Sequence, residues 1–314
     1  MDIIHLSLVV PCFNEQDALP AFYGEASRVL AELAKTGDIS VWEYIFVDDG
    51  STDDTLPVLQ SMAAADKRIR CIAFSRNFGK EAALLAGLRK AAGQFVVTLD
   101  VDLQDPPSLI PQMFEAVSTG GFDCAGTRRV NRIGEPTIRS FFARCFYAIM
   151  KKITDIEVVD GARDFRLMSR RYTDALLSLP ERSRFSKGIF PWIGYKTKWF
   201  EYKNVRRVAG ASKWSFWKLF LYSLDGIVAF STKPLALASL LGILLFLVSV
   251  GGTIAIIIRK LVLQLPDTGW SSLVCIILFV SGIQLFTIGI LGQYFAKIYI
   301  EIKQRPHYII KEEW

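Results

Sequence analysis

The sequence predicts an α/β domain with an open sheet, followed by a pair of membrane-spanning helices. Three observations support this prediction. Short β-rich runs alternate with helical stretches over residues 1–130. Two apolar runs without a charged residue lie downstream, at residues 234–258 and 270–295. The 314 residues are 51% hydrophobic with a mean hydropathy of +0.30, which is more apolar than an ordinary water-soluble domain.

Strands are expected throughout the amino-terminal part of the chain. Each expected strand is apolar on both faces, as a parallel sheet covered on both sides requires. The expected strands are residues 5–11, 43–48, 69–75, 94–100 and 123–128. Ligands of such a sheet bind beyond the carboxyl ends of its strands, so a functional site is expected at that edge.

The two apolar runs are each longer than the roughly 20 residues that span a bilayer core. The connector 259–269 contains Pro266 and Gly269 and is short enough to force an antiparallel hairpin. Lys and Arg are more frequent in the flanks of the hairpin than in the connector, which places both flanks in the cytoplasm. No export signal is recognised at the start of the sequence. We therefore expect a protein of the inner (cytoplasmic) membrane with both termini cytoplasmic.

Two stretches outside the apolar runs are amphipathic, at residues 138–153 and 213–232. Aromatic and basic residues on one helix suit the headgroup layer of a membrane. An interfacial helix is favoured for the second stretch, because it leads directly into an apolar run. For the first stretch, packing against the sheet explains the pattern equally well. The expected organisation is a cytoplasmic α/β domain at 1–212, an interfacial helix at 213–232, two transmembrane helices within 233–296 and a cytoplasmic tail at 297–314.

Charge is distributed unevenly along the chain. The net charge is +6, but residues 126–213 hold 20 Lys and Arg against 8 Asp and Glu, a local net of +12. Such a block indicates either a solvated basic face or a surface for anionic headgroups and phosphorylated substrates. No nucleic-acid-binding motif accompanies the block, so no nucleic acid partner is expected. The five Cys and two His lack metal-ligand spacing, which argues for reduced thiols and against a zinc site.

Acidic residues follow two of the expected strands. Asp48 and Asp49 follow the second strand, and Asp100 and Asp102 follow the fourth. Carboxylates this close repel one another unless a cation or a set of donors lies between them. Together with Gln104, the second pair offers the oxygen ligands that suit Mg²⁺ or Mn²⁺ shared with substrate phosphates. For the first pair, a turn and helix cap is the alternative.

Four ordered motifs read PCFNE at 11–15, VDDGSTD at 47–53, SRNFGK at 75–80 and DVDLQDP at 100–106. They resemble the motifs of family 2 glycosyltransferases with a GT-A (Rossmann-like) fold. Later segments, together with the hairpin, resemble more narrowly the polyprenyl-phosphate glycosyltransferases, including bactoprenol glucosyltransferases and dolichol-phosphate mannose synthases. Those segments read GARDFRL at 161–167, ERSRF at 181–185 and RVAGASK at 207–213.

The resemblance implies inverting transfer of one sugar, with glucose expected, from a UDP-sugar to undecaprenyl phosphate for modification of a cell-envelope glycan. It also implies a divalent cation, Mg²⁺ or Mn²⁺, held by Asp102, Asp100 and Gln104. By the same resemblance, the nucleotide-sugar contacts are Pro11, Phe13, Glu15, Asp49, Asp100, Val101, Gln104, Arg207 and Lys213.

The acceptor phosphate is already an oxyanion near neutral pH, because the second pKa of a phosphate monoester is about 6. It therefore needs positioning more than deprotonation. Arginines of the basic block are the expected clamps, since they offer paired donors. These are Arg128, Arg139, Arg163 and Arg166. Beside Asp102, the expected catalytic carboxylate is Asp164, either as base or to orient the nucleophile. Asp105 is a rival, and an ion pair between Asp164 and a neighbouring Arg is the structural alternative.

Other functions stay open at this point. The sugar could be mannose, galactose, N-acetylhexosamine or aminoarabinose on the same acceptor. A processive polysaccharide synthase would carry a Gln-x-x-Arg-Trp motif and more spans, whereas this chain has ERSRF at 181–185. A non-catalytic membrane scaffold is the third alternative. Glycines in the hairpin leave room for close helix contacts, which is compatible with packing within one chain or with a homo-oligomer.

Overall fold

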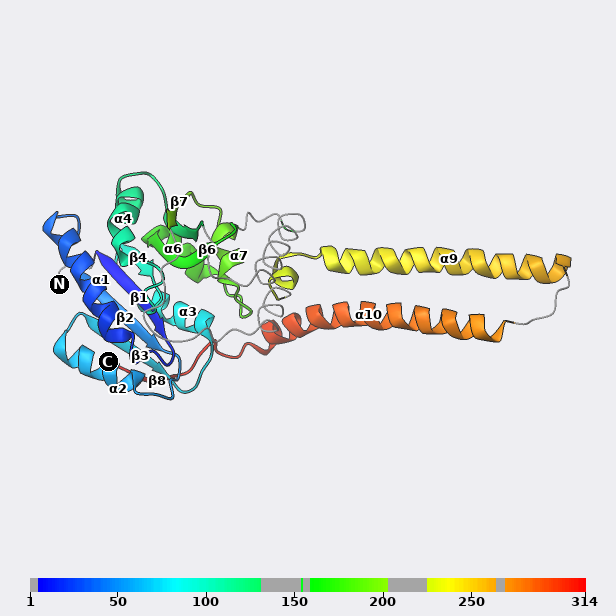
Figure 1. Cartoon of the computed structure of the whole chain (residues 1–314), viewed down its shortest axis with the longest axis horizontal. Helices are drawn as coiled ribbons and strands as arrows, with labels where there is room; N and C mark the ends of the chain where they lie inside the picture. Colours follow the sequence, from blue (N-terminus) through cyan, green and yellow to red (C-terminus); the bar gives the residue numbers. More distant parts are fainter. Residues whose placement is uncertain (1–4, 131–153, 155–158, 203–224, 264–268) are drawn as a thin grey trace. The chain divides into compact units, whose positions relative to one another are not determined.

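The structure is a computed structural model that describes the chain apart from five short segments. Those segments are residues 1–4, 131–153, 155–158, 203–224 and 264–268. The chain divides into two units (Figure 1). The first unit comprises residues 1–223 and 305–314, and the second comprises residues 224–304.

An eight-stranded sheet forms the centre of the first unit, in the order β7-β5-β6-β4-β1-β2-β3-β8 (Figure 1). The five expected strands are present as β1 Leu6–Cys12, β2 Trp42–Asp48, β3 Ile69–Phe74, β4 Phe95–Thr98 and β5 Cys124–Arg129. Strands β1 to β4 are joined by parallel pairing. Their side chains are buried on both faces, which confirms the predicted α/β class.

Three further strands were not expected, and they make the sheet mixed instead of parallel throughout. β6, Ala162–Ser169, lies between β4 and β5 and is antiparallel to both. β7, Thr197–Tyr202, runs parallel to β5 at one edge. β8, Ile310–Glu313, pairs antiparallel with β3 at the other edge. The last residues of the chain therefore belong to the sheet.

Helices cover both faces of the sheet. On one face lie α1, Leu19–Lys35, and α4, Ile110–Ser118, which follows the 3-10 turn η1, Pro107–Leu109. The other face is covered by α3, Lys80–Lys90, and α6, Arg170–Ser178. α2, Thr55–Ala65, packs on β3, and α7, Ser186–Trp192, packs on β6. In α1, apolar residues spaced three or four apart form the buried stripe, as an amphipathic helix requires.

Helix α3 runs from the edge of the sheet formed by the carboxyl ends of the parallel strands (the carboxyl edge) to the edge formed by their amino ends (the amino edge). Because it follows β3 and precedes the parallel strand β4, its first turn lies at the carboxyl edge and its last turn at the amino edge. Gly87 allows the helix to approach the sheet closely, since a Cβ there would lie 2.3 Å from Val9 Cγ1. Glu81 in the first turn and Lys90 in the last turn match the helix dipole.

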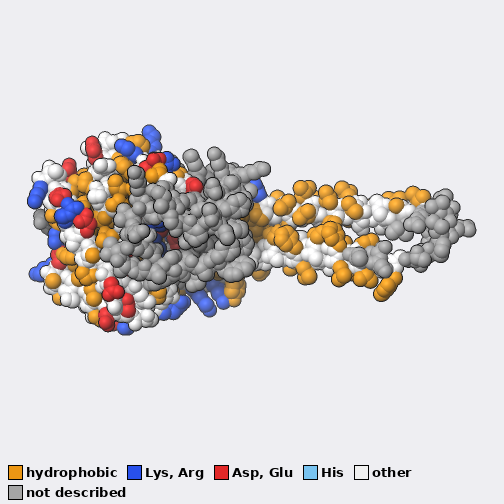
Figure 2. Space-filling view, viewed as in Figure 1, with side chains coloured by type: hydrophobic (Ala, Val, Ile, Leu, Met, Phe, Trp, Pro, Cys, Tyr) orange, Lys and Arg blue, Asp and Glu red, His pale blue; other side chains and the backbone are white. Residues whose placement is uncertain are grey.

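The second unit contains two long helices, α9 Lys233–Leu263 and α10 Trp270–Lys303. They contact each other and run antiparallel, since Tyr294 near the end of α10 donates a 2.6 Å hydrogen bond to the Ser231 carbonyl before α9. Figure 2 shows apolar side chains exposed along both helices. By length and composition, Lys233–Ala255 and Ile276–Lys303 could each cross a membrane. This confirms the predicted pair of apolar helices.

The two amphipathic predictions fall largely outside the described residues. Residues 138–153 lie wholly in a segment that the structure does not describe. Of residues 213–232, those from 225 to 232 are described; residues 225–230 are helical, and 231–232 are not. The interfacial helix at 213–232 therefore stays a prediction.

Candidate active site

The loops that follow β1, β2 and β3 interlock at the carboxyl edge of the sheet. Asn14 has a left-handed backbone, with φ of 55°, and its side-chain oxygen accepts a 2.8 Å hydrogen bond from Thr52 N. Asn14 N donates to Ser51 Oγ at 2.9 Å. Gly50, with φ of 67°, approaches Arg76 so closely that a Cβ would lie 2.4 Å from the Arg76 carbonyl carbon. The motifs at 11–15, 47–53 and 75–80 thus form one structure.

Asp48 and Asp49 use their carboxylates to shape these loops. Asp48 accepts from Ser51 N at 3.2 Å and from the Ser51 hydroxyl, as the turn alternative predicts. Asp49 accepts from Phe78 N at 2.6 Å and from Gly79 N at 2.9 Å, which fixes the turn before α3. Burial raises the pKa of both carboxyls. A nucleoside contact by Asp49 stays a prediction.

The other predicted nucleoside contacts lie on the same edge. Pro11 is the second-last residue of β1 and lies opposite Val47, and Phe13 and Glu15 follow in the next loop. All three predicted side chains are partly exposed. Glu15 N donates to Thr55 Oγ1 at 2.8 Å, which joins this loop to the first turn of α2. The structure thus brings these residues to the edge where the resemblance expects the nucleoside.

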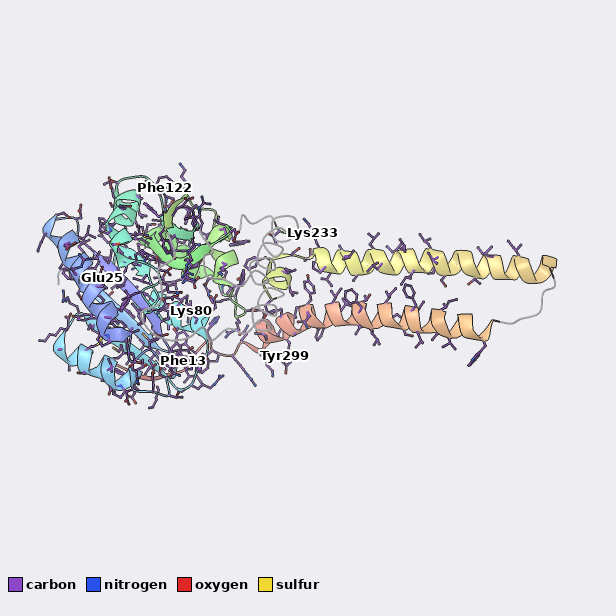
Figure 3. The ribbon with its side chains drawn as sticks, viewed as in Figure 1. Phe13, Glu25, Lys80, Phe122, Lys233 and Tyr299 are labelled. Atoms are coloured by element: carbon purple, nitrogen blue, oxygen red, sulfur yellow. The ribbon has the colours of Figure 1, made fainter. Side chains whose placement is uncertain are left out.

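Lys80 joins two acids from different strands. Its Nζ lies 2.7 Å from Asp100 Oδ1 and 2.8 Å from Asp100 Oδ2. The same Nζ lies 2.7 Å from Asp164 Oδ2. Figure 3 labels Lys80 at the start of α3, while Asp100 follows β4 and Asp164 belongs to β6. The side chains of both acids are 23% exposed, so this cluster is partly open to solvent.

The pairing of β4 with β6 explains why these two acids meet. In the antiparallel register Thr98 lies opposite Arg166. Moving two residues forward from Thr98 and two back from Arg166 brings Asp100 opposite Asp164, on the same face. Thr98 Oγ1 also donates a 2.5 Å hydrogen bond to the Asp164 carbonyl, which fixes this end of β6. The unexpected strand is therefore what places Asp164 in the site.

Opposite charges keep this cluster ionised. Burial alone would raise the pKa of Asp164, but Lys80, Lys187 and Arg163 outweigh it and hold that pKa well below the ordinary value. Burial opposes the charge on Lys80 as well, yet Asp100 and Asp164 raise the pKa of Lys80 above its ordinary value. At neutral pH the cluster therefore holds Asp164 as a carboxylate and Lys80 as an ammonium.

Asp105 is occupied by other contacts. Its buried carboxylate accepts a 3.1 Å hydrogen bond from Arg163 Nε and another from the Tyr202 hydroxyl. Arg163 in turn extends toward the cluster, with Nη2 4.0 Å from Asp100 Oδ2. Asp105 therefore anchors Arg163, and Asp164 is the better placed of the two rival carboxylates.

The loop after β4 carries the predicted metal ligands. Asp102 Oδ1 accepts from Gln104 N at 3.1 Å, and the intervening Leu103 has a φ of 53°. A branched residue in the left-handed region is strained, and such strain is often found at functional sites. Val101 is buried. Gln104 Oε1 accepts from Arg129 Nη2 at 2.9 Å, so its amide already has a partner.

A metal held by protein groups alone has little support at this loop. Within the described part of the chain, no three His, Cys, Asp or Glu residues are grouped so as to hold a metal ion. Asp100 and Asp102 nevertheless provide two carboxylates on one loop. Mg²⁺ is commonly held by one or two carboxylates together with substrate phosphates. The donor set therefore fits an ion shared with a diphosphate.

Of the four predicted acceptor arginines, the three that the structure describes have different surroundings. Arg128 forms an ion pair with Glu201 and keeps a partly exposed side chain. Arg166 is only 2% exposed and lies between two rings, 4.2 Å from the Phe190 centroid and 4.9 Å from that of Trp199. A lipid phosphate would have to displace this packing to reach Arg166, so we remove Arg166 from the acceptor clamp. Three predicted residues lie outside the described residues: Arg139, Arg207 and Lys213.

Lys80 and the adjacent Glu81 were not among the site residues predicted from the sequence. Lys80 stands in a motif that was recognised, but its two acidic partners lie on distant segments. Glu81 accepts from Ser186 N at 3.1 Å and from the Ser186 hydroxyl, which ties the start of α3 to the start of α7. Burial and the nearby charge of Asp164 raise the pKa of Glu81. The one available signal was a Lys-Glu pair opening a helix directly after a glycine.

Comparison with known proteins decides the family. The pattern of glycosyl transferase family 2 matches residues 7–177. The chain belongs to glycosyl transferase family 2. This member of the family is 41% identical over 307 residues to the bactoprenol glucosyl transferase of Shigella phage SfII, covering 98% of this chain and 97% of that protein. It is 40% identical over 310 residues to the putative glycosyltransferase CsbB of Bacillus subtilis, covering 98% and 91%.

A solved structure supports the GT-A fold of this glycosyltransferase. Glucosyl-3-phosphoglycerate synthase from Mycobacterium tuberculosis, in complex with Mn²⁺, UDP-glucose and phosphoglyceric acid, superposes with a TM-score of 0.50. The two chains are 20% identical, and the match covers 72% of this chain and 78% of the other. At this identity the likeness concerns the fold. The predicted GT-A domain is thereby confirmed.

Proposed function

We propose that this glycosyltransferase moves one glucosyl unit from UDP-glucose to a membrane polyprenyl phosphate, undecaprenyl phosphate, for modification of a cell-envelope glycan. The observation that carries the proposal is the similarity, over 98% of the chain, to an enzyme named bactoprenol glucosyl transferase. The two exposed apolar helices provide the membrane attachment that a lipid acceptor requires. We further propose that both helices span the inner membrane and that both termini are cytoplasmic.

The donor would bind across the carboxyl edge of the sheet. Pro11, Phe13 and Glu15 would contact the nucleoside, beside the loop that Asp49 fixes. Asp100 and Asp102 would hold a divalent cation, Mg²⁺ or Mn²⁺, together with the diphosphate. When bound, such an ion neutralises negative charge on the departing UDP. The structural relative from M. tuberculosis is named as a complex with Mn²⁺ and UDP-glucose, which agrees with this proposal.

The transfer itself would be a single displacement. An oxygen of the acceptor phosphate forms a bond to the anomeric carbon, the bond from that carbon to the UDP oxygen breaks, and its electron pair leaves with UDP. Attack from the face opposite the leaving group inverts the anomeric configuration. Arg163, whose Nη2 lies 4.0 Å from Asp100 Oδ2, would position the acceptor phosphate through paired donors. Arg128 and Arg139 stay predicted contacts of the acceptor.

Asp164 would orient the acceptor instead of removing a proton. The low pKa that Lys80 and its neighbours impose makes Asp164 a weak proton acceptor at neutral pH. The acceptor phosphate has lost most of its protons at that pH, because its second pKa is about 6. A fixed negative charge that sets the positions of Lys80 and the substrates is therefore the role that fits the cluster.

A lipid product assay tests the proposal. The purified full-length protein is incubated with undecaprenyl phosphate, Mg²⁺ or Mn²⁺ and a panel of radiolabelled nucleotide sugars. We expect a lipid carrying one glucose from UDP-glucose. Asp102→Ala should lower turnover by at least about 100-fold, because metal-ion stabilisation of a leaving group is worth several kcal/mol. Asp66→Asn is a control that removes one carboxylate far from the site.

Four results would overturn parts of the proposal. Preferred transfer from another sugar nucleotide would reject glucose. Labelled chains of many sugars would indicate a processive synthase, and no transfer or hydrolysis with any donor would indicate a scaffold. Normal turnover by a folded Asp102→Ala protein would reject the metal assignment.

A further inference from the structure

Lys80 makes contacts that conflict with the proposed metal site. Its Nζ lies within hydrogen-bond distance of both oxygens of Asp100, at 2.7 and 2.8 Å. The metal proposed above needs at least one of those oxygens, at a distance of about 2.1 Å. An ammonium and a divalent ion on the same carboxylate repel each other, and the partly buried setting screens that repulsion less than water does.

The second ion pair of Lys80, with Asp164, does not conflict with the proposed metal site. Asp164 Oδ2 lies 2.7 Å from the same Nζ, on the side of β6. Asp164 is not among the proposed metal ligands. The ammonium can therefore release Asp100 and still remain paired with Asp164.

We propose that Lys80 is a positioning residue that takes the place of the divalent cation before the donor binds, and that it releases Asp100 while keeping Asp164 when metal and diphosphate arrive together. This inference rests on the proposed function. Before the donor binds, the lysine holds two acids together that would otherwise repel. The negative charge of the diphosphate then offsets the repulsion between the Lys80 ammonium and the metal ion. Metal and donor should consequently bind together much better than the metal binds alone.

A purely structural ion pair makes a different prediction. If Lys80 only held the fold together, its removal would displace Asp100 and Asp102 and would weaken metal binding or leave it unchanged. If Lys80 competes with the metal for Asp100, its removal frees a ligand and removes a like charge. The protein without nucleotide should then bind the metal more tightly, although turnover falls.

Helix α3 offers a matched control at its other end. Lys90 Nζ lies 2.7 Å from Glu313, and its side chain is 37% exposed, against 38% for Lys80. The two lysines are ten residues apart, or about 15 Å along the helix axis. Lys90→Gln therefore removes the same charge and the same type of ion pair, far from Asp100.

The test is a titration of Mn²⁺ into the full-length protein without nucleotide, with free Mn²⁺ measured by electron paramagnetic resonance. We expect Lys80→Gln to bind Mn²⁺ about 10-fold more tightly than wild type, as expected for removal of one nearby like charge. Lys80→Arg keeps the charge and should resemble wild type. Lys90→Gln should match wild type in Mn²⁺ affinity and turnover. Adding UDP should reduce the difference in Mn²⁺ affinity between Lys80→Gln and wild type.

Turnover provides the second measurement on the same proteins. Lys80→Gln should lower kcat by at least about 10-fold, because Asp164 loses the cation that positions it. In Lys80→Gln with Asp100→Asn, the gain in Mn²⁺ affinity should disappear, since the freed ligand is absent. Lys80→Met should behave as Lys80→Gln does. If neither Lys80→Gln nor Lys80→Met folds, the wild-type protein still tests the inference. The inference would be overturned if wild type bound Mn²⁺ equally well with and without UDP.

The inference and the proposed function fail in different ways. Lys80→Gln that binds Mn²⁺ no more tightly than wild type, while Asp102→Ala loses binding, overturns only the role of Lys80. Asp102→Ala that binds Mn²⁺ as wild type does overturns the metal site itself. The titration uses neither sugar nor lipid, so a different sugar or acceptor in the product assay would leave its result unaffected.

Discussion

The amino and carboxyl edges of the central sheet both hold acidic side chains, but they hold them in different ways. At the amino edge, Glu43 has a side chain only 5% exposed. It accepts from Ser7 Oγ at 2.6 Å, from Ala92 N at 2.9 Å and from Arg70 Nη1 at 3.3 Å. At the carboxyl edge, Asp100 and Asp164 share the ammonium of Lys80 and are 23% exposed.

This difference separates a structural carboxylate from functional ones. A backbone N–H and a buried hydroxyl are fixed by the fold, so the partners of Glu43 cannot exchange for a ligand. A lysine ammonium is a compact charge on a flexible stem, and it can release one acid for another partner. The amino edge therefore contributes to folding, whereas the carboxyl edge can rearrange when substrates bind.

The largest effect is expected at the carboxyl edge. Asp164→Asn keeps the shape of the side chain but removes the charge that pairs with Lys80. Turnover should fall by at least about 100-fold, as for other groups that position reactants. The variant should also be less stable than wild type at neutral pH, because a carboxyl whose pKa is held low stabilises the folded protein. Steady-state kinetics of the folded variant measures the fall in turnover, and turnover within about threefold of wild type would mean that Asp164 is not in the site.

At the amino edge, a substitution should lower the stability of the protein and leave its turnover unchanged. This effect is expected to be of intermediate size. Glu43→Gln can keep its oxygen facing Ser7 and Ala92, but it turns an amide N–H₂ group toward Arg70 and replaces hydrogen bonds to a charged group with neutral ones, a loss of about 1 kcal/mol. The variant should unfold at lower denaturant concentration, with turnover per folded molecule unchanged. A variant with wild-type stability and reduced turnover would reverse the roles assigned to the two edges.

The smallest effect concerns a surface pair at the amino edge. The hydrogen bonds of Arg68 lower the pKa of Asp66 to about 2. Because this pKa lies below the ordinary value of 3.8, the ionised pair stabilises the folded protein above about pH 4, and that contribution is lost as the pH falls through about 2. Its size should be at most about 1 kcal/mol, since Arg68 is exposed.

Asp66→Asn checks this pH dependence. At pH 7 the variant should be slightly less stable than wild type, and the two stabilities should converge between pH 4 and pH 2. Denaturant unfolding at several pH values measures the difference. A difference that stays constant down to about pH 2 would show that the charge of Asp66 contributes nothing.

Strands β1 to β5 and the apolar hairpin were predicted from local patterns in the sequence. A buried strand and a long apolar helix each appear as an apolar run of characteristic length. β6 was not predicted, since its place between β4 and β5 depends on pairing with residues at least 34 positions away. The position of β6 in the sheet also bears on the predicted role of Arg166. On a strand, residues three apart point to opposite faces, so Arg163 and Arg166 cannot form one clamp.

In the site as well, the sequence predicted features that lie within one motif and did not predict contacts between distant segments. The acids after β4 and the motif around Asp164 were recognised from the sequence, as was the glycosyltransferase family. The contacts of Lys80 were not, because α3, β4 and β6 meet only in the folded chain. Asp49 was expected to face the nucleoside, yet its carboxylate holds backbone groups of the next loop. Such side-chain partners follow from tertiary packing and not from motif spacing.

The most direct test of the proposed transfer is the structure of the lipid product. The purified protein is supplied with undecaprenyl phosphate and UDP-glucose, and the product is analysed by mass spectrometry and by NMR of the anomeric proton. Our account predicts one glucosyl unit on the lipid phosphate, with the anomeric configuration inverted relative to UDP-glucose. A product with retained configuration, or no sugar on the lipid, would contradict it.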